Sequence, residues 1–190
     1  RLDHYAVFME NTLHYIECCV AGERSGLYYT CINSYLKADE LAYILDNSES
    51  RVLITSRSRL LAALEALAHC PGVALCLVVD ADTPLPAEAA GGCRLARYQD
   101  AVAPFPGTPI ADESLGAAML YSSGTTGRPK GILRPLPEQP PVQPLPLFAF
   151  LQTLWHGRPG MVYLSPAPLY HSAPLSNINI TLRNGGTAIV

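Results

Sequence analysis

The sequence predicts an α/β fold built from layered, parallel βαβ units, and two observations predict it. Short apolar segments rich in strand-forming residues alternate with amphipathic segments of about 10–14 residues along the first half of the chain. One short segment, LCLVV at residues 75–79, is apolar throughout, which is typical of a strand covered on both faces. Strands that alternate with helices form a parallel sheet with helices packed against it.

The first half of the chain supplies the predicted βαβ units. We expect strands at residues 4–9, 27–32, 51–55 and 75–79. We expect a helix capped by Asn11 and closed near Gly22 or Gly26, a helix over residues 40–47, and a helix capped by Ser56 that ends before Pro71. The small and proline-containing residues 81–92 predict a loop.

A second group of elements begins after residue 116. Strands are expected at 117–121, 161–164 and 187–190, and helices at 148–155 and 176–183. Between them, residues 134–146 contain six prolines, which excludes a regular helix or a central strand. We therefore divide the chain, residues 1–190, into a βαβ subregion (1–116) and a second subregion (117–190).

Composition excludes several functional classes. The chain has 190 residues, a length typical of one domain, and 49% of them are hydrophobic. Its net charge of −3 argues against a basic nucleic-acid-binding module. No apolar run approaches the roughly 20 residues of a membrane span, and no signal-peptide pattern is visible. The six cysteines show no zinc-ligand spacing, so we expect small buried thiols in a reducing compartment.

The two ends of the sequence are apolar. The chain opens almost directly on a predicted strand and stops inside another one. Domain termini are usually polar and exposed. We therefore expect a segment of a larger domain, with a naturally truncated protein or a split gene as the alternative.

The segment YSSGTTGRPKG, at residues 121–131, carries the strongest functional signal. It follows a predicted strand and combines glycines, hydroxyl side chains and Lys130. Glycines let backbone amides turn toward an anion, hydroxyls add donors, and a lysine adds a point charge suited to phosphate. The spacing is not that of a Walker A loop, because Lys130 is followed by Gly131. Composition alone therefore predicts a phosphate-binding loop, and a solvated Ser/Gly turn is the other interpretation.

This segment resembles the phosphate-binding signature of the adenylate-forming superfamily, which includes acyl-CoA synthetases, amino-acid adenylation domains and luciferases. The segments 9–11, 21–27, 32–33 and 39–45 are similar to the family's early substrate-domain pattern, and PLYHSAP at 168–174 is similar to a segment that borders the acyl pocket. GRPKGILRPLP at 127–137 is similar to one branch of bacterial acyl-CoA synthetases. The resemblance implies part of the large N-terminal domain of such an enzyme. Lys37 departs from it, because relatives often carry a helix-capping Thr there.

The resemblance implies a two-step reaction. A carboxylic acid, with a fatty acid expected, attacks the α-phosphate of ATP to give an acyl-adenylate and pyrophosphate, and coenzyme A then takes the acyl group. Lys130 and Thr126 would be catalytic, and Thr125 and Thr126 the main ATP contacts. The implied phosphate-binding residues are Ser122, Ser123, Gly124, Thr125, Thr126, Gly127 and Lys130. His171 would line the acyl pocket; a structural loop histidine or a metal ligand are its alternatives.

Several groups that the resemblance calls for have no candidate after the loop. Residues 132–190 contain one carboxylate, Glu138, and no lysine. Relatives use a downstream Glu for Mg²⁺, an Asp for the ribose and a Lys on a C-terminal lid. We therefore assign no metal ligand, expect the lid domain to be absent, and predict that this chain alone is not a competent ligase. The alternatives are a non-catalytic truncated paralogue and an amino-acid or aryl adenylation domain. The resemblance also implies a cytoplasmic location, with peripheral membrane contact as an alternative.

Overall fold

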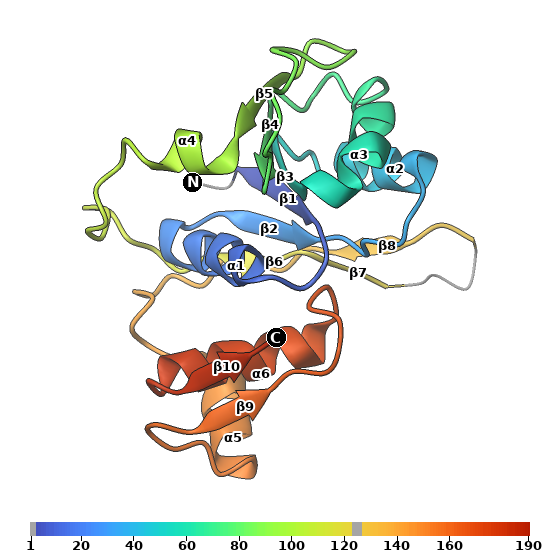
Figure 1. Ribbon diagram of the computed structural model, residues 1–190. Coiled ribbons are helices and arrows are strands. Elements are labelled where there is room, and N and C mark those ends of the chain that lie inside the picture. Colours follow the sequence, from blue (N-terminus) through green and yellow to red (C-terminus); the bar gives the residue numbers. More distant parts are fainter. Residues whose placement is uncertain (1–2, 123–126) are drawn as a thin grey trace.

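A parallel sheet forms the centre of the molecule (Figure 1). The computed structural model describes residues 3–122 and 127–190, and in these residues the main sheet has six strands in the order β5-β4-β3-β1-β2-β6, each pair of neighbours parallel. This confirms the predicted α/β class. The strands are β1 (His4–Phe8), β2 (Tyr28–Cys31), β3 (Val52–Ser56), β4 (Leu75–Val79), β5 (Arg94–Arg97) and β6 (Ala117–Ala118).

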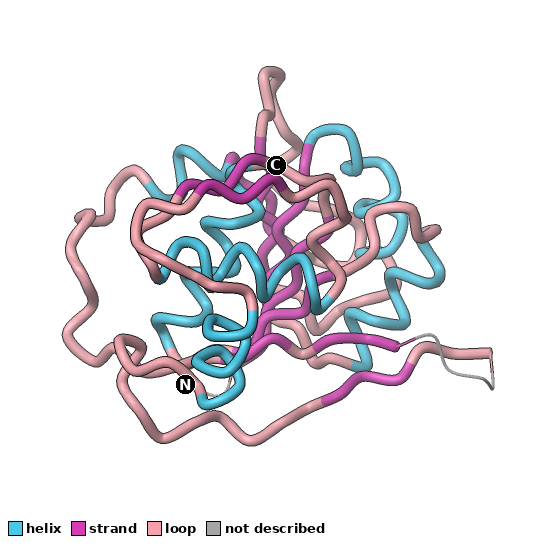
Figure 2. The backbone as a smooth tube through the Cα atoms, turned by 90° about the horizontal axis from the view of Figure 1, so that it is seen from below, coloured by secondary structure: helices cyan, strands magenta, loops and turns pink. Residues whose placement is uncertain are grey.

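Helices cover both faces of this sheet, as the tube in Figure 2 shows. Alternate residues of β1 enter two separate cores: Ala6 and Phe8 face α2 and α3, whereas Tyr5 and Val7 face α1. Since successive side chains of a strand point to opposite faces, residues 5–8 of β1 are apolar because both faces of the strand are buried. The helices of this half are α1 (Leu13–Ser25), α2 (Ala38–Asn47), α3 (Leu60–Leu67) and α4 (Tyr98–Val102), with a 3₁₀ turn at Arg57–Arg59.

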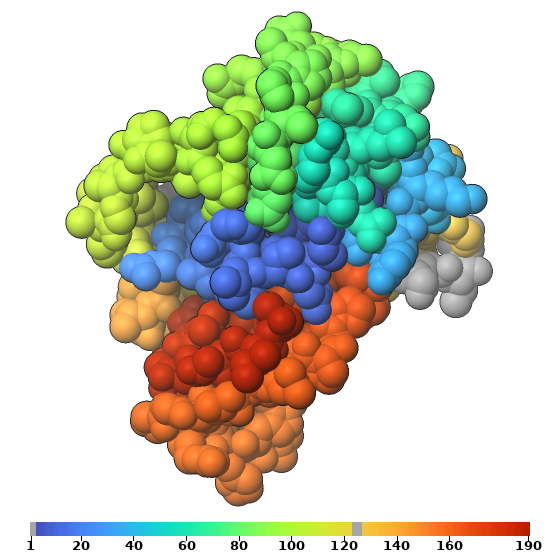
Figure 3. Space-filling view, in the orientation of Figure 1, coloured from blue at the N-terminus to red at the C-terminus, as the bar shows by residue number. Residues whose placement is uncertain are grey.

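The second half adds a hairpin and a small layer below the sheet. β7 (Leu120–Ser122) and β8 (Lys130–Ile132) pair antiparallel, and β9 (Val162–Leu164) pairs in parallel with β10 (Thr187–Ile189). The helices are α5 (Pro146–Leu154) and α6 (Ser172–Arg183). Leu169, Leu175 and Ile178 complete the core around α1. The space-filling view shows this orange and red segment packed against the blue N-terminal segment (Figure 3).

Several local predictions differ from the structure. Asn11 does not cap α1; the hydroxyl of Thr12 accepts from the Tyr15 N–H at 3.2 Å instead. Ser56 makes no capping bond, because its hydroxyl donates to Glu10 Oε2 at 2.7 Å. The sequence analysis also missed β5, α4 and β8, and the single strand predicted at 117–121 is divided into β6 and β7. β5 is an edge strand whose arginines lie toward solvent, so it lacks the apolar run that marked the other strands.

No side chain caps helix α2 at Lys37, the position where relatives often carry a helix-capping Thr. The Lys37 ammonium has no lone pair and cannot accept from the first turn. Instead, the Glu40 carboxylate accepts from the Lys37 backbone N–H at 3.0 Å, which satisfies one donor at this end. The predicted helix therefore forms with one of the two hydrogen bonds of a capping box.

All six cysteines lie in the described part of the chain and are free and buried, as predicted. Cys19 and Cys31 come nearest to each other, with their sulfur atoms 3.7 Å apart in the core under α1. Burial is the main cause that raises the pKa of the Cys18 thiol to about 12 and that of Cys93 to about 11. These thiols are packing groups rather than nucleophiles.

Candidate phosphate-binding site

The predicted phosphate loop joins the two strands of the β7–β8 hairpin. Ser122 and Lys130 face each other across the pair, so they mark the two sides from which the loop extends, and both are exposed. Gly127 is also exposed and has φ +97°, a backbone conformation that favours glycine. The structure therefore presents the ends of the loop to solvent. The predicted ligands Ser123, Gly124, Thr125 and Thr126 lie outside the described residues.

Helix α2 contacts this hairpin on both sides of its loop, at Tyr121 in β7 and at Pro129 directly before β8. The Tyr43 hydroxyl donates to the Pro129 carbonyl oxygen at 3.1 Å, and the Tyr121 hydroxyl donates to Asn47 Oδ1 at 2.7 Å. The Arg128 guanidinium lies 5.0 Å from the centroid of the Tyr43 ring, within cation–π range. Burial, the largest cause, raises the pKa of Tyr121 to about 12, so its hydroxyl keeps its proton at neutral pH.

His171 lies apart from the hairpin contacts. It is exposed at the N-cap position of α6, its backbone N–H donates to the Pro168 carbonyl oxygen at 3.2 Å, and its ring centroid is 4.5 Å from that of Tyr170. Among the described residues, no hydrogen bond, ion pair or ring contact joins His171 to Ser122 or Lys130. The structure thus brings Ser122, Gly127 and Lys130 to one hairpin and leaves His171 on another element.

A polar cluster at the carboxyl ends of β1 and β3 was missed by the sequence analysis. Glu10 accepts from the hydroxyls of Ser56 and Ser58 at 2.7 and 2.9 Å, and Arg59 Nε lies 3.8 Å from its carboxylate. Burial alone would raise the pKa of Glu10, but its own backbone N–H, these hydroxyls and Arg59 outweigh burial and lower it. The signal that could have found the cluster is the polar residues that directly follow two predicted strands.

This cluster lies at the point where the chain reverses its direction across the sheet. From β1 the chain passes through α1 to β2 on one side, and then through α2 to β3 on the other side. The helices that follow β1 and β3 therefore lie on opposite faces of the sheet, so this is its topological switch point. In open α/β sheets this is the place where ligands bind.

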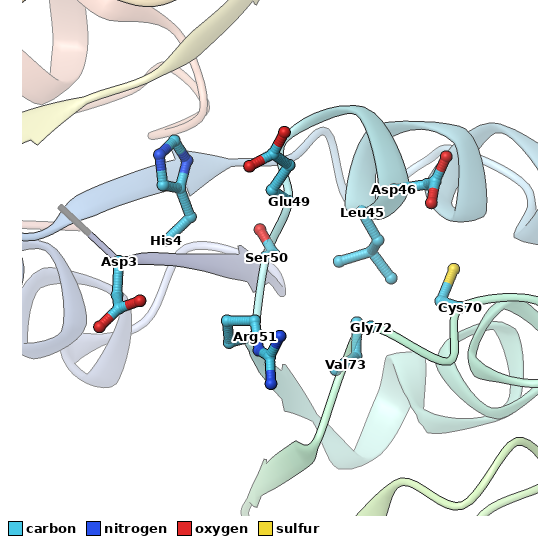
Figure 4. Close-up of a pocket in the computed structure, with 10 residues that line it drawn as sticks. All are labelled: Asp3, His4, Leu45, Asp46, Glu49, Ser50, Arg51, Cys70, Gly72 and Val73. Carbon is cyan, nitrogen blue, oxygen red and sulfur yellow. The ribbon is translucent and has the colours of Figure 1, made fainter.

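Two hollows lie away from the predicted residues. A cavity of about 450 Å³ opens at the amino ends of β1 and β3, and its lining includes His4, Arg51 and the carboxyl side chains of Asp3, Asp46 and Glu49 (Figure 4). Burial, the largest cause, lowers the pKa of His4, although Glu49 and Asp3 oppose it. A second hollow of about 670 Å³ runs along the apolar residues between α1 and α4. Neither is lined by a residue predicted to bind phosphate.

Comparison with known proteins decides what this hairpin belongs to. All residues, 1–190, match the protein family described as AMP-binding enzyme. This chain belongs to the AMP-binding enzyme family. The resemblance inferred from the YSSGTTGRPKG segment is therefore confirmed, and the parallel sheet is part of the fold of adenylate-forming enzymes.

Relatives of this AMP-binding chain include CoA ligases that are named for different acids. It is 36% identical to a 4-hydroxybenzoate–CoA/benzoate–CoA ligase of Rhodopseudomonas palustris over 110 residues, which cover 58% of this chain and 19% of the relative. It is 27% identical to a medium-chain-fatty-acid–CoA ligase of Ectopseudomonas oleovorans over 135 residues, which cover 69% of this chain and 24% of the relative. The AMP-binding chain thus spans less than a quarter of each of these two relatives.

The fold of the AMP-binding chain also occurs in solved structures. ATP-bound MatB from Rhodopseudomonas palustris superposes with a TM-score of 0.69 at 22% identity, over 100% of this chain and 35% of that chain. At this identity the likeness concerns the fold. In the described part of the AMP-binding chain, no helix is long and apolar enough to cross a membrane, and no group of three or more His, Cys, Asp or Glu side chains could hold a metal ion.

Proposed function

We propose that this chain supplies the phosphate-binding part of an ATP-dependent acid–thiol ligase of the AMP-forming type. In the proposed reaction a carboxylate oxygen attacks the α-phosphorus of ATP, the bond to the β-phosphate oxygen breaks, and pyrophosphate leaves. The acyl group of the resulting adenylate then passes to the thiol of coenzyme A, and AMP leaves. The observation that carries this proposal is the β7–β8 hairpin, which presents both ends of the YSSGTTGRPKG loop to solvent.

The loop residues would bind the β- and γ-phosphates of ATP. Backbone amides near Gly124 and Gly127, together with hydroxyls of Ser122, Ser123, Thr125 and Thr126, offer hydrogen-bond donors to phosphate oxygens. Negative charge accumulates on pyrophosphate as it leaves, and a fixed cation stabilises that charge. Lys130, exposed at the start of β8, would supply it, with Thr126 as the second catalytic group.

The proposal assigns no residue of this chain to Mg²⁺. ATP reacts as its magnesium complex in such ligases, but the described residues hold no group of carboxylates, histidines or cysteines suited to a metal. We therefore derive no step through the metal. In the proposed organisation, subregion 1–116 provides five of the six strands of the main sheet, subregion 117–190 provides β6 and the phosphate loop, and His171 lines the acyl pocket. The proposed location is the cytoplasm, where ATP and coenzyme A are available, with peripheral membrane contact as the alternative.

The proposed acid is a fatty acid, and an aromatic acid is the second candidate. The similarity of residues 127–137 to bacterial acyl-CoA synthetases favours the first. The 36% identity to a benzoate–CoA ligase favours the second. A longer polypeptide that contains this sequence can be assayed with decanoate and with benzoate, and hydroxylamine traps the acyl-adenylate. The acid that gives the trapped product distinguishes a fatty acid from an aromatic acid as the substrate. We expect the 190-residue chain alone to form neither product, because it lacks candidates for the ribose and lid groups.

ATP binding tests the proposal on the chain itself. In a calorimetric titration we expect ATP and pyrophosphate to bind the 190-residue chain and adenosine to bind much more weakly. Replacing Lys130 with Ala should weaken ATP binding about 10- to 150-fold, since a charged hydrogen bond to phosphate contributes roughly 1.5–3 kcal/mol. Lys37→Ala is the matched control, because Lys37 is the other lysine of the chain and precedes α2. Equal binding of ATP and adenosine would overturn the phosphate site.

A further inference from the structure

We infer that Tyr43 and Asn47 of α2 are positioning residues that hold the phosphate hairpin in place. Their effect on ATP binding rests on the proposed function, whereas the anchoring itself is independent of it. The two residues are four positions apart in one helix, so they lie on the same face, one turn from each other. From that face they contact both sides of the loop base.

The two contacts fix the hairpin from its two strands. Tyr43 donates to the Pro129 carbonyl oxygen at 3.1 Å, directly before β8, and Asn47 accepts from the Tyr121 hydroxyl at 2.7 Å, in β7. Since one contact holds the segment that enters the loop and the other holds the segment that leaves it, a shift of either strand breaks a hydrogen bond. The Arg128 guanidinium over the Tyr43 ring adds a third contact on the same helix.

The hairpin needs such anchors because it is short. β7 and β8 have three residues each and pair with one another outside the main sheet. A two-stranded hairpin is at best marginally stable in water. Phosphate binding requires donors held in a defined geometry, and a misplacement of about 1 Å is costly in an active site. Helix α2 is well suited as a support, since Leu41, Ile44 and Leu45 fix it to the sheet.

Gly131 makes room for Tyr121, the hairpin residue that bonds with Asn47. A Cβ atom at Gly131 would lie 2.9 Å from Cζ of Tyr121 and 2.5 Å from Cε of Met119. The methionine end can move, but the tyrosine ring would have to leave the position from which its hydroxyl reaches Asn47. The glycine at this point of the loop segment therefore allows Tyr121 to lie across β8 and bond with α2.

Three variants test the inference on the 190-residue chain. Tyr43→Phe removes only the hydroxyl that holds Pro129, Asn47→Leu removes the acceptor for Tyr121, and Asn47→Asp keeps an acceptor oxygen. Tyr35→Phe is the matched control, because Tyr35 precedes α2 and is 76% exposed. Hydrogen exchange of the backbone amides of Lys130, Gly131 and Ile132 measures how often the hairpin opens, without any ligand. Calorimetric titration with ATP reports its effect on binding.

We expect Tyr43→Phe and Asn47→Leu to speed exchange in β8 and to weaken ATP binding about 5- to 10-fold, the loss typical of one hydrogen bond. The melting temperature should change by less than about 4 °C, and Asn47→Asp and Tyr35→Phe should behave like the unaltered chain. Unchanged exchange in β8 would overturn the inference. The inference would also be overturned if the unaltered chain binds ATP and Tyr43→Phe and Asn47→Leu bind it equally well. If the unaltered chain binds no ATP, the proposed function fails, and the exchange rates still decide the anchoring.

Discussion

The side chain of Asn11 bridges the backbone on both sides of Pro168. Its Oδ1 accepts from the Leu169 N–H at 2.9 Å, and its Nδ2 donates to the Ala167 carbonyl oxygen at 3.0 Å. Leu169 is fully buried in the core around α1. The first turn after β1 is thereby joined to the start of the segment that carries His171, more than 150 residues later in the sequence.

Replacing Asn11 with Ala should destabilise the chain by about 1–3 kcal/mol, because the partly buried backbone groups at positions 167 and 169 lose their partners. Urea unfolding followed by circular dichroism measures this change. Asn33→Ala is the control, since Asn33 accepts one bond from the exposed Tyr35 N–H, at 2.9 Å. A loss for Asn11→Ala no larger than that for Asn33→Ala would contradict the bridge.

Glu23 and Arg183 join α1 to α6 in a nearly buried ion pair. Arg183 lies 3.2 Å from Glu23 Oε2, and the side chains are 23% and 11% exposed. Tyr29 and Asn179 also donate to the Glu23 carboxylate. Arg183→Ala should cost about 3 kcal/mol, because it leaves a buried carboxylate without its countercharge.

A second ion pair on α1 provides the matched comparison for this prediction. Arg24 pairs with Glu113 at the surface, with 51% and 28% of the side chains exposed. Exposed pairs contribute at most about 1 kcal/mol, so Arg24→Ala should cost far less than Arg183→Ala. Both values come from the same urea experiment, and similar losses would refute a special role for the buried pair.

Periodicity was enough to predict the sheet but not the bonds between distant segments. The strands β1 to β4 are apolar because both faces are covered, and this pattern is local in the sequence. The partner of a polar side chain depends on the tertiary fold. Asn11 and Ser56 both have the residue types of helix caps, yet Asn11 bonds with Leu169 and Ser56 with Glu10.

The candidate site was likewise predicted only in part: neighbours along the chain were identified, and contacts between distant segments were not. The loop sequence identified Ser122, Gly127 and Lys130 as neighbours, because they are close along the chain and lie at the ends of one loop. The support by Tyr43 and Asn47 could not be predicted, since nothing in the sequence relates a tyrosine in a helix to a carbonyl oxygen 86 residues later. The cluster around Glu10 needed the order of the strands as well.

Glu10 should make the stability of the chain depend on acid pH. Its pKa is lower in the folded chain than the ordinary 4.5 of a glutamate. The unfolded state then binds the proton more readily, so this contribution is complete above about pH 4.5 and is lost as the pH falls through the lower folded value. The difference in unfolding free energy between the unaltered chain and Glu10→Gln should therefore shrink between pH 5 and pH 3, whereas a constant difference would contradict the assignment.

The buried thiols should be slow to react in the folded chain. Burial is the largest cause that raises the pKa of both Cys18 and Cys76 to about 12, so at pH 8 only about one in ten thousand of these thiols is the reactive thiolate. With Ellman's reagent at pH 8, we expect six thiols to react promptly in 6 M guanidinium chloride and almost none in buffer. Fewer than six in denaturant would reveal a disulfide, and rapid reaction in buffer would show that the core around α1 opens easily. The sulfur atoms of Cys19 and Cys31 lie 3.7 Å apart. If these two form the disulfide, Cys19→Ser should increase the number of thiols that react in denaturant; if all six are free, it should lower that number by one.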